Sequence, residues 1–222
     1  MRKFSIEADK KRVENLHKYE NAVRNRGYRL IAGVDEAGRG SLVGSVVVAA
    51  VILPENIYLE RLDDSKKLSA NVREILCAEI MDKAISYAWI EVGVDEIDEL
   101  NIYQATLEGM KRAVQKLAPK PDYVLTDAMH VDDFGDNIQT QPIIHGDSLS
   151  ASIAAASIIA KVTRDRLAND WAKKFPNYGF EHNRGYGTKF HRDAIKKHGA
   201  CEIHRKSFNP VKSMLSSGLT SP

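Results

Sequence analysis

The sequence Gly33-Val34-Asp35-Glu36-Ala37-Gly38-Arg39-Gly40 follows the apolar residues Leu30-Ile31-Ala32. The apolar run predicts a strand over residues 28–35 that ends on two adjacent carboxylates. Carboxylate oxygens bind hard cations, glycines let a backbone approach a ligand closely, and the guanidinium of Arg39 matches the geometry of a phosphate. This stretch therefore contains the components of metal-dependent chemistry on a phosphate.

The segments around this stretch predict a sheet with helices. Residues 44–53 are continuously apolar and rich in β-branched side chains, which is typical of a strand covered on both faces. The glycine-rich connection between these two strands predicts a hairpin. Further strands are predicted over 86–94, 123–127 and 142–144, and helices over 6–25, 70–84, 102–117, 150–173 and 188–198. Because strands and helices are interspersed and a hairpin comes first, the predicted fold class is α/β with a mixed five-stranded sheet.

The composition is that of an ordinary globular protein. The chain has 222 residues, of which 43% are hydrophobic and 28% charged. We expect a single domain over 1–212 and a flexible, Ser-rich tail over 213–222. The net charge of +2 permits a nucleic-acid partner but does not argue for one. No signal peptide is visible, and the longest apolar stretches are well short of the ~18 residues of a membrane span. We therefore expect a soluble, cytoplasmic protein with no membrane association.

Acidic residues follow three separate apolar strands. Asp35 and Glu36 end the first strand, Asp127 ends the strand over 123–127, and Asp147 follows the strand over 142–144. Ligands of open α/β sheets gather at strand ends, so these acids are able to converge. Converging carboxylates repel one another, and a divalent cation would remove that repulsion. Because all of the ligands would be oxygens, the site would select a hard ion such as Mg²⁺ or Mn²⁺. The alternative is that these acids are solvated caps and turn residues.

Two of these acids are adjacent in the sequence, which raises a geometric difficulty. Neighbouring residues of a regular strand point to opposite faces of the sheet. Asp35 and Glu36 therefore share one site only if the strand ends or is bulged there, and Gly38 and Gly40 favour such an irregularity.

Several segments, taken together and in order, resemble type 2 ribonuclease H. The similarity covers about residues 19–211. The matching segments are 31–40, 64–68, 101–102, 124–127, 146–147, 152–165, 185–188 and 204–208. The resemblance implies a ribonuclease H-like mixed sheet flanked by helices, with an N-terminal helix over about 6–25 and a C-terminal helical part over about 188–212 that helps to grip a duplex.

The resemblance also implies an activity and a set of site residues. The activity is endonucleolytic hydrolysis of RNA in RNA–DNA hybrids and at ribonucleotides embedded in duplex DNA, leaving 3′-hydroxyl and 5′-phosphate ends. The family's metal-binding catalytic acids fall on Asp35, Glu36, Asp127 and Asp147, which would hold Mg²⁺ or Mn²⁺, two ions during catalysis. Its element for recognising the ribose 2′-hydroxyl falls on Gly38, Arg39 and Gly40, and its junction-reading tyrosine on Tyr186. The 2′-hydroxyl is what distinguishes RNA from DNA at a given position.

Basic residues in the matching segments are candidate phosphate contacts. These are Lys66, Lys161 and Arg164, and the alternative for each is solvated surface charge. The chain departs from the usual bacterial pattern at Ser41 and Ser45, where prolines are common, and at Ala128, where glycine is common. We expect the enzyme to act on these duplexes as a monomer.

Two other functions stay open at this stage. One is a non-catalytic duplex-binding module, because a fold alone does not grant activity. Retention of all four acids argues against it. The other is a different nuclease of the same superfold, such as a junction resolvase, and a requirement for a 2′-hydroxyl would separate the two nucleases.

Overall fold

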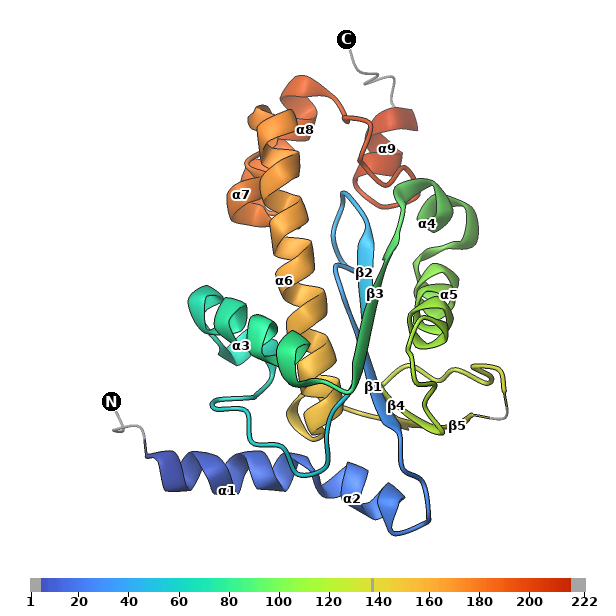
Figure 1. The fold of residues 1–222 in the computed structure, drawn as a ribbon. Helices are drawn as coiled ribbons and strands as arrows, with labels where there is room; N and C mark the ends of the chain where they lie inside the picture. Colours follow the sequence, from blue (N-terminus) through green and yellow to red (C-terminus); the bar gives the residue numbers. More distant parts are fainter. Residues whose placement is uncertain (1–4, 137, 217–222) are drawn as a thin grey trace.

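A mixed five-stranded sheet forms the centre of the molecule (Figure 1). The computed structural model describes residues 5–136 and 138–216. Antiparallel pairing joins β3 to β2 and β2 to β1, and parallel pairing joins β1 to β4 and β4 to β5, which gives the order β3-β2-β1-β4-β5. The strands are β1 (Ile31–Ala37), β2 (Val46–Ile52), β3 (Ser86–Val92), β4 (Tyr123–Asp127) and β5 (Gln139–Ile143). The predicted fold class is confirmed.

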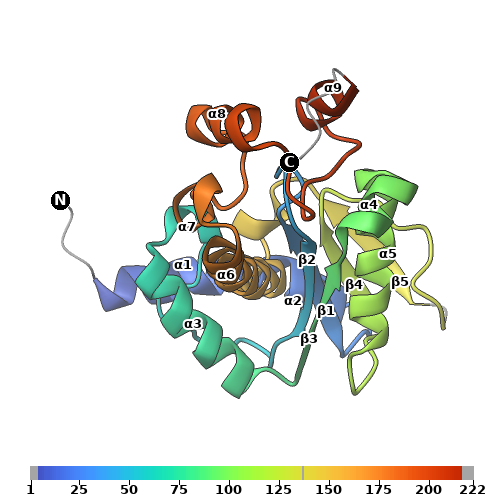
Figure 2. The same ribbon diagram turned by 90° about the horizontal axis from the view of Figure 1, so that it is seen from above.

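Helices cover both faces of this sheet (Figures 1 and 2). One face carries α3 (Ala70–Lys83) and α6 (Ala151–Lys174), and the other carries α4 (Val94–Leu100) and α5 (Ile102–Gln115). Strand β2 is buried along its whole length because alternate residues enter the two cores. Its continuous apolar sequence is therefore explained by double coverage, as predicted.

Helix α6 packs on strand β1 at backbone distance. A Cβ atom placed on Gly33 would lie 2.1 Å from the carbonyl carbon of Ser152 in the first turn of α6. The next turns of α6 present Ala154, Ala155 and Ala156, which are all fully buried. Small side chains on both elements thus allow the close approach, and they fix the position of the helix along the strand that carries Asp35.

The N-terminal segment differs from the single helix predicted over 6–25. It forms α1 (Ile6–Leu16) and α2 (Lys18–Arg24), which meet at His17. The His17 ring is buried, and its Nε2 lies 2.9 Å from the carbonyl oxygen of Ile57. This tertiary contact accompanies the break, and no glycine or proline in the segment signals it.

The C-terminal part is helical, as expected, but it extends further than predicted. It contains a 3-10 turn (Pro176–Tyr178), α7 (Phe180–Asn183), α8 (Lys189–His198) and α9 (Val211–Ser216). Helix α9 includes residues 213–216, which had been assigned to the flexible tail, because Val211, Met214 and Leu215 pack on the C-terminal apolar cluster. The rest of the predicted tail, 217–222, lies outside the described residues.

Strand β5 also begins earlier than predicted. It starts at Gln139 rather than at Pro142, and its first four residues are exposed or half-buried. A polar edge strand has too little apolar periodicity to be found from sequence. In the part of the chain that the structure describes, no helix combines the length and apolarity needed to cross a membrane.

The contact between β1 and α6 gives a first prediction. Gly33→Ala should lower the free energy of unfolding by about 1–3 kcal/mol or more, because the new methyl group cannot enter without moving the helix backbone. Urea unfolding followed by circular dichroism measures this. Gly93→Ala is the matched control, since a Cβ there meets no atom within 4 Å and the backbone φ of −69° suits alanine. Equal stability of the two variants would contradict the proposed contact.

Candidate active site

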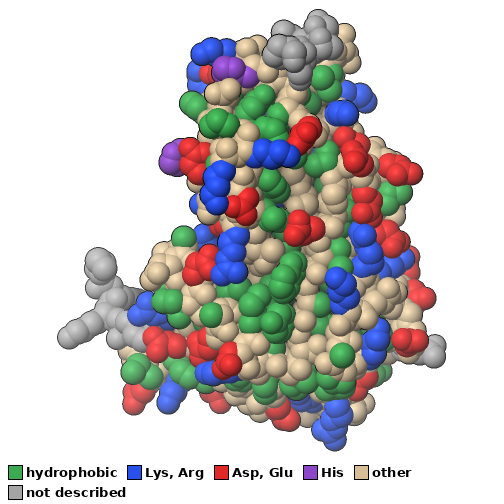
Figure 3. Space-filling view, turned by 45° about the horizontal axis from the view of Figure 1, so that its top comes forward, with side chains coloured by type: hydrophobic (Ala, Val, Ile, Leu, Met, Phe, Trp, Pro, Cys, Tyr) green, Lys and Arg blue, Asp and Glu red, His purple; other side chains and the backbone are tan. Residues whose placement is uncertain are grey.

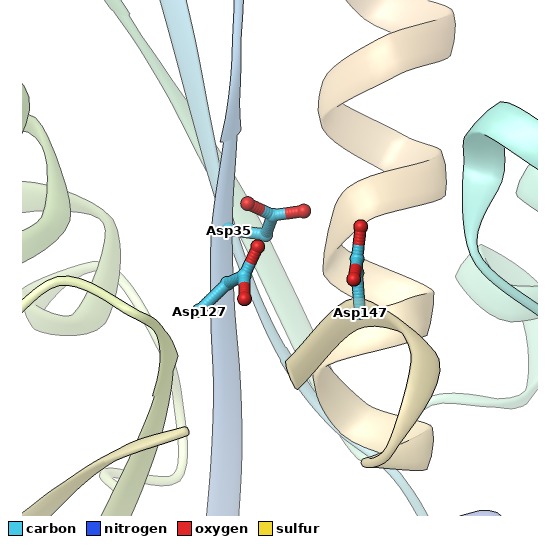
Figure 4. Close-up of side chains that lie close together, drawn as sticks. All are labelled: Asp35, Asp127 and Asp147. Carbon is cyan, nitrogen blue, oxygen red and sulfur yellow. The ribbon is translucent and has the colours of Figure 1, made fainter. Parts of the chain in front are cut away.

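Three carboxylates converge at one end of the sheet (Figure 4). Asp35 of β1, Asp127 of β4 and Asp147 of the 3-10 turn η2 (Gly146–Ser148) each offer one oxygen, and these oxygens lie within 4.8 Å of one another. Parallel pairing of β1 with β4 places Asp35 beside Asp127. The backbone N–H of Gly146 donates to Asp127 Oδ1 at 2.7 Å, which brings η2 to the same place. The predicted convergence is therefore present.

Burial makes this cluster electrostatically costly. Desolvation raises the pKa of Asp35 well above its ordinary value, and the nearby charges of Glu36 and Asp127 raise it further. Burial and the neighbouring Asp147 raise the pKa of Asp127. A cation of charge +2 would remove both the repulsion and the desolvation penalty, because it replaces the missing water as a ligand of these oxygens.

Glu36 reaches the site without a bulge in the strand that carries it. Strand β1 continues to Ala37 and keeps an unbroken register with β2, with Asp35 opposite Ala49 and Glu36 opposite Val48. Of the two irregularities expected at the acids, the bulge is therefore absent, whereas the strand end is present on one side only. Pairing of β1 with β4 stops at Val34, so Glu36 lies beyond the end of that ladder.

The carboxylate of Glu36 is only partly paired. Its Oε1 accepts a hydrogen bond from Arg39 Nη1 at 3.1 Å, and its Oε2 is buried and has no partner among the described residues. Burial raises the pKa of Glu36, and the charge of Arg39 opposes that shift. Glu36 is not part of the three-oxygen cluster, but its unpartnered oxygen is available to a further ligand.

A cavity of about 260 Å³ joins Asp35, Glu36 and Asp127 to other predicted site residues. Its walls come from β1, from the turn after β1, from the end of β4, from the segment that carries Lys66, from α6 and from the segment before α8. The lining includes Asp35, Glu36, Gly38, Arg39, Gly40, Lys66, Asp127, Lys161 and Tyr186. Tyr186 lies beside the glycine turn. Its Cε1 is the nearest atom, at 3.9 Å, to a Cβ placed on Gly40. The structure thus brings the metal-binding and sugar-reading candidates together.

Two of the three predicted phosphate contacts border this cavity. Lys66 Nζ lies 2.8 Å from Asp147 Oδ2, and its side chain is 76% exposed. Lys161 Nζ lies 2.6 Å from Asp165 Oδ1. Both ammonium groups are thus held at the cavity by acids, where a phosphate can reach them.

The third predicted contact, Arg164, is elsewhere. Its side chain is 1% exposed, and it donates to the carbonyl oxygens of Val43, Ser45 and Arg184 at 2.9–3.3 Å. A guanidinium that is this deeply buried and donates to three backbone carbonyls cannot also contact a phosphate in this arrangement. The placement contradicts the predicted role of Arg164.

Sequence reasoning missed Ser65, Ser157 and Arg205. Ser157 forms a hydrogen bond that opposes the rise in the pKa of Asp35, and its Oγ lies 2.8 Å from Ser65 Oγ. Ser157 lies one helical turn before Lys161, so helical spacing could have placed the two side chains on the same face of α6. Arg205 is fully buried beneath the glycine turn. It belongs to a segment that supported the resemblance, but nothing in the sequence indicates its burial.

The donor set fits hard divalent cations. All candidate ligands are carboxylate oxygens, three of them are gathered within 4.8 Å, and Glu36 Oε2 is buried without a partner. Such oxygen-rich sites suit Mg²⁺ or Mn²⁺.

Comparison with known proteins identifies the family. The family model described as ribonuclease HII matches residues 32–211. The chain belongs to the ribonuclease HII family. A relative named ribonuclease HII, from Bacillus cereus (strain AH820), is 51% identical over 207 residues, which cover 93% of this chain and 79% of the relative. The chain is accordingly a metal-dependent endoribonuclease.

Solved structures agree with the ribonuclease HII assignment. The ribonuclease H2 of Pyrococcus horikoshii OT3 is 28% identical, with a TM-score of 0.72 over 85% of this chain and 98% of that one. The ribonuclease HII in a PCNA complex from Archaeoglobus fulgidus is 26% identical, with a TM-score of 0.69 over 82% and 96% of the two chains.

The raised pKa values give a second prediction. Asp35→Asn should raise the melting temperature in EDTA, by ~2–4 °C for each kcal/mol of repulsion that the neutral amide relieves. The same change should abolish the increase in melting temperature that Mn²⁺ produces in the unmodified protein. Asp132→Asn is the control, since that side chain is 95% exposed. Undiminished stabilisation of Asp35→Asn by Mn²⁺ would show that the cation binds elsewhere.

Proposed function

We propose that this enzyme hydrolyses the RNA strand of RNA–DNA hybrids and cuts at ribonucleotides embedded in duplex DNA by a two-metal mechanism. One observation carries the proposal: three of the acids (Asp35, Glu36 and Asp127), the turn at residues 38–40 and Tyr186 line a single cavity. A scissile phosphate at the acids would then have its sugar beside the turn and the tyrosine.

The acids would hold Mg²⁺ or Mn²⁺, with Asp35, Asp127 and Asp147 gathered and Glu36 contributing its free oxygen. Two bound cations supply activation of a water and stabilisation of the leaving oxygen. The water oxygen bonds to phosphorus, the bond from phosphorus to the 3′-oxygen breaks, and the products end in a 5′-phosphate and a 3′-hydroxyl. Lys66 and Lys161, which line the same cavity, would contact phosphates of the substrate backbone.

Recognition of the sugar would come from the other end of the cavity. Backbone groups of Arg39 and Gly40 approach the ribose 2′-hydroxyl, and the ring of Tyr186 packs on the neighbouring deoxyribose. On the face drawn in Figure 3, Lys and Arg side chains are interspersed with Asp and Glu. Selectivity for the substrate therefore depends on this cavity rather than on a broad basic surface on that face. The cytoplasmic location and the monomeric state stay predictions.

A third prediction tests the chemistry. Asp127→Asn should lower Mg²⁺- or Mn²⁺-dependent cleavage of a duplex with one embedded ribonucleotide by at least ~10²-fold, because several kcal/mol of charge stabilisation are lost. Asp170→Asn, at an acid of α6 that is 69% exposed, should cleave normally. A gel assay with an all-DNA duplex in parallel completes the test. Binding without cleavage by the unmodified protein would support the duplex-binding module, and its cleavage of the all-DNA duplex would support another nuclease.

A fourth prediction concerns Tyr186. Tyr186→Ala should reduce cleavage at a single embedded ribonucleotide by ~10-fold, equivalent to about 1.4 kcal/mol, relative to cleavage within a long RNA stretch. The melting temperature should change little, because the side chain is 41% exposed. Tyr103→Ala, on α5 and 44% exposed, is the control. A large fall in melting temperature with an unchanged cleavage ratio would make Tyr186 a packing residue.

A further inference from the structure

Two arginines are buried side by side beneath the turn that follows β1. Arg205 is 0% exposed and Arg164 is 1% exposed. Within the described residues neither guanidinium has a carboxylate oxygen within 4.0 Å. Burial and the charge of Arg164 lower the pKa of Arg205 to about 9. Burying unpaired cations is a poor way to gain stability, so the pair calls for another explanation.

The N–H groups of Arg205 donate hydrogen bonds to backbone carbonyl oxygens of the turn. Its Nη2 donates to Gly38 O at 2.9 Å, its Nη1 to Arg39 O at 2.9 Å, and its Nε and Nη2 to Gly44 O at 3.0 and 2.9 Å. One rigid guanidinium therefore holds three carbonyl groups of the turn at once. A lysine, with a single nitrogen, cannot reproduce this geometry.

Holding these carbonyls also fixes the direction of the N–H groups. In a planar trans peptide unit, the C=O of one residue and the N–H of the next point in opposite directions. With Gly38 O and Arg39 O directed inward to Arg205, the N–H groups of Arg39 and Gly40 are directed away from it. Within 5–136 and 138–216, neither N–H donates to a protein acceptor. Both residues line the cavity beside Tyr186.

We propose that Arg205 is a positioning residue for ribose recognition, which orients the Arg39 and Gly40 N–H groups toward the 2′-hydroxyl of the substrate. This inference rests on the proposed function of the cavity. Arg205 has no exposed atom with which to contact substrate, so it acts through the turn. Arg164 supports the same turn from the side, at Val43 and Ser45.

The test compares binding of two duplexes that differ by a single 2′-hydroxyl. Both are measured by fluorescence anisotropy in Mg²⁺ with Asp127→Asn protein, which should bind without cutting. The ratio of the two Kd values should favour the ribonucleotide duplex by ~10-fold before Arg205 is changed, because two new hydrogen bonds are worth about that factor. With Arg205→Lys or Arg205→Met added, the ratio should fall to about 1, while the affinity for the all-DNA duplex changes less than 3-fold. An unchanged ratio would overturn the proposal.

A further measurement keeps the proposal testable where the variants do not fold. Arg205→Met leaves three buried carbonyl oxygens without a donor, so its melting temperature should fall whether or not the arginine positions the turn, and the ratio of Kd values decides between the two roles. If either variant fails to fold, amide NMR of the Asp127→Asn protein decides. The Arg39 and Gly40 amides should shift with the ribonucleotide duplex and not with the all-DNA duplex, and equal shifts would overturn the proposal. Equal affinities before any change at Arg205 would instead contradict the proposed function.

Discussion

The whole site depends on the contact between the backbones of β1 and α6 at Gly33. Because no side chain separates the two elements there, the helix axis is held close to the strand that bears Asp35. Ser157 and Lys161 then project from successive turns of α6 into the cavity. Asp147 depends on the same contact, since η2 leads directly into α6 and its Gly146 carbonyl accepts from the N–H of Ser150. The close packing of β1 against α6 thus sets the relative positions of the side chains in the site.

Opposite charges are buried close to one another, on the two sides of the turn that lines the cavity. In the cavity wall, burial raises the pKa values of Asp35, Glu36 and Asp127. Beneath the turn, burial lowers the pKa values of Arg164 and Arg205. Neither group neutralises the other by direct contact. The acids are arranged for a cation, whereas the guanidinium groups donate to carbonyl oxygens, so each group keeps a separate task.

The acids could be found from the sequence, and the arginines could not. Asp35 and Asp127 each end a recognisable apolar strand, and parallel strands end at the same edge of a sheet, so convergence follows from local patterns. Lys161 and Arg164 were both predicted as phosphate contacts, but the sequence could not tell which of them is buried. The burial of Arg164 depends on the space left by Gly38, which is distant in sequence: a Cβ there would lie 1.8 Å from Arg164 Nε. The break at His17 was missed for the same reason, because its cause is a tertiary contact.

The glycines in and around the turn after β1 are of two kinds: some are required by packing inside the protein, and one is not. Side chains at Gly33, Gly38 and Gly44 would collide with Ser152, Arg164 and Trp171 at 1.8–2.1 Å, so these three serve contacts inside the protein. At Gly40, the nearest atom to an added Cβ is Tyr186 Cε1 at 3.9 Å, and the residue is exposed. A glycine that packing does not require is the one best explained by a ligand. The ribose is therefore expected at Gly40, between the turn held by Arg205 and the ring of Tyr186.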